Sequence, residues 1–175
     1  ERFNPDPSHP RYWLIKKERS GGGPMFDFGC HRVEVLLNLL GPIRETRGRN
    51  WNALFDREVE DSSAALFEFE SGARGLLTVT HAAIEPQDTL DIFGSDGSVH
   101  VRVLNEGTLE VRTSDGVRRE SHPTRENTHQ PLIDDFSRAV LEGRVPAVTG
   151  DVGLEVARVI EDIYENPRGT GGPRA

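Results

Sequence analysis

Residues 20–42 read SGGGPMFDFGCHRVEVLLNLLGP, and they contain the signals for both ends of one helix. A serine, three glycines and a proline are typical of a helix start, because proline fits the first helical turn. The closing glycine and proline are typical of a helix end, since glycine adopts the left-handed cap and proline cannot continue the helix. The pattern predicts a helix from about Met25 to Leu40.

Four polar residues follow one stripe of this largely apolar helix, at i, i+4, i+7 and i+11: Asp27, His31, Glu34 and Asn38. Burying such a stripe is costly unless its groups meet partners, water or a ligand. One interpretation makes Asp27 and His31 an acid/base pair, because histidine titrates near neutral pH and can take a proton from an alcohol. The other makes them the solvated side of the helix, and the spacing alone favours this second interpretation.

From Ile43 to about Ser121 the pattern changes to short alternating runs. Val99–Val103 and Thr108–Arg112 alternate apolar and polar residues, as strands with one solvated face do. Turn dipeptides typical of hairpins separate such runs: Ser71-Gly72, Asp96-Gly97 and Asp115-Gly116. We expect about six or seven strands in a largely antiparallel sheet, because short turns join strands that are neighbours in the sequence.

Helical periodicity returns in two segments near the C-terminus. One runs from about His129 to Gly143, and the other follows Thr149 with its apolar residues on one stripe. Helix, sheet and then helices is an α+β order. We expect a two-layer fold, in which an open, mostly antiparallel or mixed sheet carries helices on one face, in one domain over residues 1–165. Residues 166–175 are expected to form a flexible tail.

Charge and composition exclude several classes of protein. The 175 residues carry a net charge of −8, so we expect no basic surface for nucleic acid or an anionic membrane. The sequence contains no apolar run long enough to cross a membrane and no apolar signal-peptide core. Its one cysteine, Cys30, cannot form a disulfide within the chain. These features predict a cytoplasmic protein without nucleic-acid or membrane partners.

The glycine run with Asp27-Phe28-Gly29-Cys30-His31 resembles a known family. The C-terminal domains of the glucose-fructose oxidoreductase, inositol dehydrogenase and rhizopine-catabolism (Gfo/Idh/MocA) oxidoreductases carry a similar glycine run followed by Asp-x-Gly-x-His. Leu90–Ser98 and Pro146–Leu154 are similar to later segments of that domain. The resemblance covers about residues 10–165. It implies an open mixed sheet with helices on one face. Glu34 stands where an aspartate is more usual, and we give it no catalytic role.

The resemblance also implies a function. In that family a Rossmann domain binds NAD or NADP, and the C-terminal domain supplies much of a sugar or polyol site. His31 would be the acid/base on the substrate hydroxyl, and Asp27 its helper or a substrate-binding group. This chain has no Rossmann domain, because it lacks both the dinucleotide fingerprint and the family's lysine motif, so we expect it to be inactive alone. By the same analogy the exposed sheet face would join the subunits of a homo-oligomer.

Four further residues are candidates for the substrate site. Gly22 and Gly23 let the backbone approach a ligand without side chains in the way. Tyr12 and Trp13 either line a pocket beside these glycines or pack in the core. As site residues, all four are expected to contact the sugar or polyol.

Two alternative functions remain open. The first is a non-catalytic binding or assembly module of the same fold, because the cofactor domain is absent from this chain. The second is a metal-dependent hydrolase or isomerase in which His31 and Glu34, at i and i+3, are ligands. His81, His122 or His129 would have to complete that site. The leading interpretation has no metal.

Overall fold

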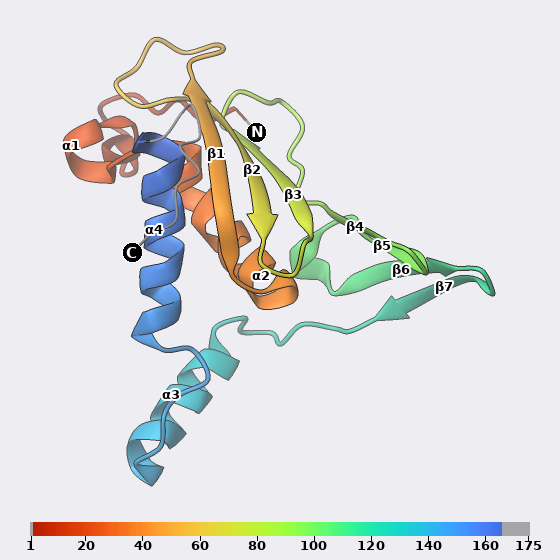
Figure 1. The fold of residues 1–175 in the computed structure, drawn as a ribbon. Helices are drawn as coiled ribbons and strands as arrows, with labels where there is room; N and C mark the ends of the chain where they lie inside the picture. The colour runs from red at the N-terminus through yellow and green to blue at the C-terminus, as the bar shows by residue number, and fades with distance from the viewer. Residues whose placement is uncertain (1, 166–175) are drawn as a thin grey trace. The chain divides into compact units, whose positions relative to one another are not determined.

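The computed structural model describes residues 2–165, which form an α+β fold with antiparallel sheets (Figure 1). The chain divides into two compact units. One contains the described residues up to Ile84 and from Val148 onward, and the other is Glu85–Ala147. The assignment of residues 1–165 to one domain stays a prediction, and the expected tail, 166–175, lies outside the described residues.

The first unit is built on three antiparallel strands in sequence order: β1 (Ile43–Trp51), β2 (Ser62–Phe69) and β3 (Arg74–Thr80). Inward and outward residues alternate along β2, as they must on a pleated strand with one buried face. Phe67 and Phe69 are fully buried, whereas Leu66 between them is exposed. One face of this sheet therefore carries the core, and the other is open.

Helices cover the buried face of this sheet. The helical elements of this unit are a 3-10 turn (Tyr12–Ile15), α1 (Lys17–Ser20), which has no buried residue, a π-helical turn (Met25–Gly29), α2 (Cys30–Leu40) and α4 (Gly150–Glu165). In α4, Val159, Ile160 and Ile163 of the predicted apolar stripe are buried. This helix runs close against β1, because a Cβ added at Gly48 would lie 2.5 Å from the Ile163 carbonyl oxygen.

The helix expected over Met25–Leu40 is present, but its first turn is not α-helical. Met25–Gly29 forms a π-helical turn in which the Cys30 N–H bonds to the Met25 carbonyl. A Cβ at Gly29 would lie 2.5 Å from the Met25 sulfur, so the glycine makes room for the buried methionine. The helix ends as predicted at Gly41, which has a φ of +87°. π-Turns inside helices occur frequently at functional sites.

The second unit contains four antiparallel strands in sequence order: β4 (Leu90–Gly94), β5 (Gly97–Val101), β6 (Thr108–Thr113) and β7 (Gly116–Ser121). A 3-10 turn (Leu104–Glu106) links the middle pair, and α3 (Gln130–Glu142) follows the sheet. As predicted, α3 ends at Gly143, whose φ of +64° suits a glycine cap.

The α+β class and the antiparallel pairing are confirmed. The described strands span Ile43 to Ser121, as expected, and the three predicted hairpin turns join β2 to β3, β4 to β5 and β6 to β7. The strands form two sheets rather than the single sheet we expected, because β3 and β4 do not pair.

Candidate functional site

Asp27 lies in the π-helical turn, where other segments of the first unit reach its carboxylate. Arg11 Nη2 lies 3.3 Å from Asp27 Oδ2, and His81 Nε2 lies 3.4 Å from the same oxygen. The arginine is exposed and the histidine is buried, so the carboxylate is held from a solvated side and from the interior. Asp27 therefore has a defined position at the edge of the core.

His31 lies one turn further along, at the second residue of α2, and it is exposed. Within the described part of the chain, its ring makes no hydrogen bond or ion pair. The structure thus places Asp27 and His31 on one helical segment, four residues apart, but it joins Asp27 to Arg11 and His81 rather than to His31. An exposed imidazole without a side-chain partner among the described residues is chemically suited to proton transfer with an added hydroxyl group.

The glycine run is packed tightly against Glu60. The Gly23 N–H donates to Glu60 Oε1 at 2.9 Å, and the Tyr164 hydroxyl donates to the same oxygen. A Cβ at Gly22 would lie 2.5 Å from the Tyr164 hydroxyl oxygen. Burial raises the pKa of Glu60, although these hydrogen bonds act in the opposite direction. Close packing alone thus accounts for Gly22 and Gly23, and their contact with substrate stays a prediction.

A hollow of about 290 Å³ opens beside this run, with Gly21, Gly22 and Tyr164 in its wall. Tyr12 and Trp13, in the 3-10 turn before the run, are not among the residues that line it. Trp13 is 43% exposed, and the Lys16 ammonium lies 5.1 Å from the centre of the Tyr12 ring. Neither aromatic residue is part of the buried core, so core packing does not explain them. Their role in substrate binding stays a prediction.

No sequence pattern indicates the contacts that Arg11 and Arg57 make at this site, and His81 was expected only as a possible metal ligand. A signal for the buried His81 was present, because Leu77, Val79 and His81 continue the two-residue alternation of β3 toward the core. No comparable periodic signal marks the arginines, which lie in irregular segments.

A buried aspartate, Asp61, fixes the loop that carries Arg57. Its carboxylate accepts the N–H groups of three successive loop residues, Ala53, Leu54 and Phe55, each at 2.8 Å. Burial opposes the charge, but these bonds and one from the Ser62 hydroxyl outweigh it and lower the pKa of Asp61 to about 2. The loop is therefore anchored by an ionised group at neutral pH.

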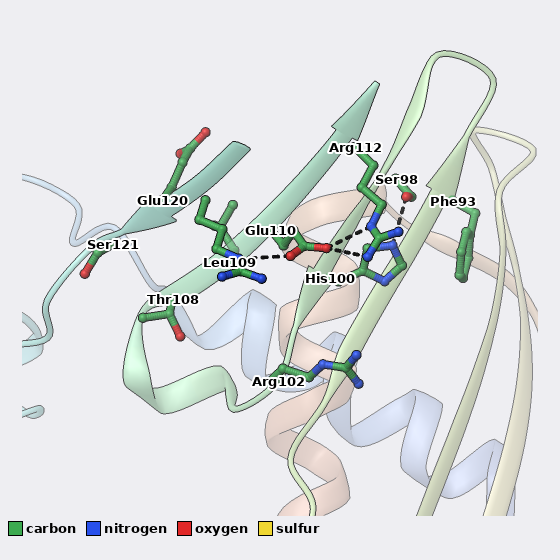
Figure 2. Close-up of a pocket in the computed structure, with 11 residues that line it drawn as sticks. Phe93, Ser98, His100, Arg102, Thr108, Leu109, Glu110, Arg112, Glu120 and Ser121 are labelled. Carbon is green, nitrogen blue, oxygen red and sulfur yellow. Dashed lines mark hydrogen bonds and ion pairs between the residues drawn. The ribbon is translucent and has the colours of Figure 1, made fainter. Parts of the chain in front are cut away.

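A second hollow, of about 890 Å³, lies over the four-stranded sheet of the other unit (Figure 2). Glu110 accepts hydrogen bonds from Arg112 and Arg119, and Nε2 of His100 contacts the Ser98 hydroxyl. The other ring nitrogen of His100 contacts Asp91. These charges are paired with one another, which favours a structural role over catalysis.

No group of three or more His, Cys, Asp or Glu residues in the described part of the chain lies in a position to hold a metal ion, so His31 and Glu34 have no third ligand there. None of the helices in residues 2–165 has the length and apolar character that crossing a membrane requires.

The family follows from comparison with known proteins. The model of the GFO/IDH/MocA C-terminal domain matches residues 1–100, which include the glycine run, Asp27 and His31. The chain belongs to this family. A curated relative from Amycolatopsis mediterranei (strain S699), a putative UDP-kanosamine synthase oxidoreductase subunit, is 24% identical over 170 residues, covering 86% of this chain and 43% of the relative.

Solved structures of oxidoreductases share the fold. The aldose-aldose oxidoreductase from Caulobacter crescentus, complexed with glycerol, has a TM-score of 0.81 at 25% identity. The match covers 94% of this chain and 50% of the chain of that oxidoreductase. A levoglucosan dehydrogenase in complex with NADH and levoglucosan has a TM-score of 0.79 at 21% identity. This match covers 93% of this chain and 52% of the chain of the dehydrogenase. The chain thus spans about half the length of these relatives, and it corresponds to the C-terminal domain of the oxidoreductases.

Proposed function

We propose that this domain forms the substrate-binding half of an NAD(P)-dependent oxidoreductase that acts on a sugar, a polyol or a related hydroxy compound. His31 is the acid/base, and Asp27 orients the substrate hydroxyl or the imidazole. The observation that carries this proposal is the contrast between the two residues. Asp27 is fixed by Arg11 and His81, whereas His31 is exposed and free of partners among the described residues.

In this proposal a residue of the chain itself, His31, transfers the proton of the substrate hydroxyl. As the substrate C–OH becomes a carbonyl, His31 takes the hydroxyl proton, and it returns a proton in the reverse direction. Bound NAD or NADP supplies the acceptor for the hydride that leaves the same carbon. This chain lacks the glycine fingerprint of a dinucleotide site, so the cofactor would be held mainly by a Rossmann domain outside it.

A protein containing this chain and an NAD(P)-binding domain of the family tests the proposal. We expect it to reduce NAD⁺ or NADP⁺ with at least one member of a panel of aldoses and polyols, measured by nicotinamide absorbance. The 175-residue chain alone should show no reduction under the same conditions.

Two other outcomes would contradict the proposal. Sugar binding by calorimetry without any nicotinamide reduction would favour the non-catalytic module. Sugar turnover without nicotinamide, lost on chelation and restored by a divalent metal, would favour the metal-dependent alternative.

We further propose that the open face of the three-stranded sheet joins subunits. Leu66 and Leu76 are direct partners on β2 and β3, and both are exposed, Leu76 by 72%. Exposed leucines side by side on an otherwise solvated sheet face are typical of a contact surface. The opposite face, with Phe67 and Phe69, is already buried by helices.

Replacing Leu76 with glutamate is expected to reduce the oligomer mass measured by light scattering to that of the monomer, because a charge would have to be buried at the contact. The control is Ala157→Glu, at an exposed position of α4 in the same unit. An unchanged mass for Leu76→Glu, or a wild-type protein that is already monomeric at micromolar concentration, would show that this face does not join subunits.

A further inference from the structure

His81 connects Asp27 to an arginine in the interior of the first unit. It directly follows β3 and is only 4% exposed. Its two ring nitrogens face different partners: Nε2 lies 3.4 Å from Asp27 Oδ2, and Nδ1 lies 2.9 Å from Arg57 Nη2. Arg57, His81 and Asp27 therefore form a connected series of side chains from the interior to the candidate catalytic carboxylate.

The arginine determines which nitrogen of His81 carries the proton. A guanidinium group only donates hydrogen bonds, so Nδ1 has to be the acceptor in its contact with Arg57. The proton of the neutral ring is then on Nε2, which faces Asp27. Burial and the charge of Arg57 lower the pKa of His81 to about 4, against the opposing effect of Asp27. At neutral pH His81 is thus a neutral ring whose protonated Nε2 lies 3.4 Å from the carboxylate oxygen Oδ2 of Asp27.

Neither the arginine nor the ring is free to reorient. Arg57 donates to the backbone carbonyls of Phe3, Val59 and Glu60, at 3.0, 3.2 and 2.6 Å. The Phe3 ring lies edge-on to the imidazole, with a centroid distance of 5.0 Å. A network whose members are fixed by packing and by backbone hydrogen bonds holds its last member to a defined geometry.

The two side chains that contact the Asp27 carboxylate among the described residues reach the same oxygen. His81 approaches Oδ2 from the interior, and Arg11 approaches it from the exposed side. Neither contact uses Oδ1. Arg11 and His81 therefore hold the carboxylate by one oxygen, and within residues 2–165 no side-chain partner is found for Oδ1.

We infer that His81, held by Arg57, is a positioning residue that fixes Asp27 through Oδ2 and presents Oδ1 to a hydroxyl group of the substrate. This inference rests on the proposed function, because it assigns a task within the same site. It adds an interior residue that acts only through Asp27.

The tautomer is tested first, by NMR of the 175-residue chain with ¹⁵N-labelled histidine, and it needs no activity. His81→Gln identifies the His81 signals among those of the 6 histidines. At pH 7 the wild-type ring should be neutral with its proton on Nε2. In Arg57→Met the pKa of His81 should rise, because a neighbouring positive charge is lost, whereas the exposed Arg47→Met should leave it unchanged. A protonated ring or a proton on Nδ1 in the wild type would overturn the inference.

The positioning role is tested by turnover in the protein with both domains. His81→Phe should lower kcat by about 10- to 100-fold, with a smaller change in KM, because a misplaced carboxylate loses orientation in the transition state. His81→Gln, whose amide can still donate to Asp27, should recover most of that loss. Equal kcat values for the Phe variant and the wild type, or equal losses for Phe and Gln at equal thermal stability, would overturn the role. If the wild type has no activity, the proposed function fails, and the NMR result alone decides the Arg57–His81–Asp27 geometry.

Discussion

Replacing His31 with asparagine is expected to lower kcat by about 10²- to 10⁴-fold in the protein that also carries the NAD(P)-binding domain. Asparagine retains polarity and similar size but cannot accept the proton of a substrate hydroxyl. The fold should be unaffected, since His31 is exposed and has no side-chain partner among the described residues. Steady-state oxidation of the preferred sugar or polyol gives kcat and KM, and KM should change much less than kcat.

The matched control is His129→Asn, which is also an exposed histidine but lies just before α3 in the other unit. It should retain the wild-type kcat. Near-normal turnover of His31→Asn would assign the base to another group and would leave Asp27 as a binding residue only.

Local chemistry explains which parts of the fold could be predicted from sequence. The ends of α2 and α3 follow from glycines that adopt positive φ, and the hairpins follow from glycine turns between alternating runs. The separation into two sheets could not be predicted in this way. Alternation shows that β3 and β4 exist, but it does not show which strands pair. The π-turn was missed because an apolar pattern does not distinguish one helical hydrogen-bonding register from another.

The candidate site likewise has a part that could be predicted from sequence and a part that could not. Asp27 and His31 could be proposed from sequence because they are four residues apart in one predicted helix. The contact between Asp27 and His81 was not found, since it joins a helical turn to the residue after β3. Arg57 acts on this pair from an irregular loop that is anchored by Asp61. Periodicity describes single elements, whereas the contacts of Asp27 come from several elements.

Replacing Gly23 with alanine is expected to lower the free energy of unfolding by about 3 kcal/mol, at the upper end of what overpacking costs. The added Cβ would lie 2.0 Å from the Glu60 carbonyl oxygen, which is backbone and cannot rotate away. Relief would require the glycine run to move, and that would weaken the bond from the Gly23 N–H to Glu60. Chemical denaturation gives the free energy, and the melting temperature should fall by about 6–12 °C for a domain of this size.

Gly153→Ala should instead raise the free energy of unfolding. Gly153 lies in α4 with open space around its would-be Cβ and no positive φ, so alanine should stabilise the helix by about 0.5–1 kcal/mol. The pair separates the two interpretations of the glycine run, since close packing predicts that Gly23→Ala loses stability before any ligand is added. If Gly23→Ala instead unfolds like the wild type but binds sugar more weakly, glycine is required there by the substrate. The contact between Gly23 and Glu60 would then be a consequence of that requirement rather than its cause.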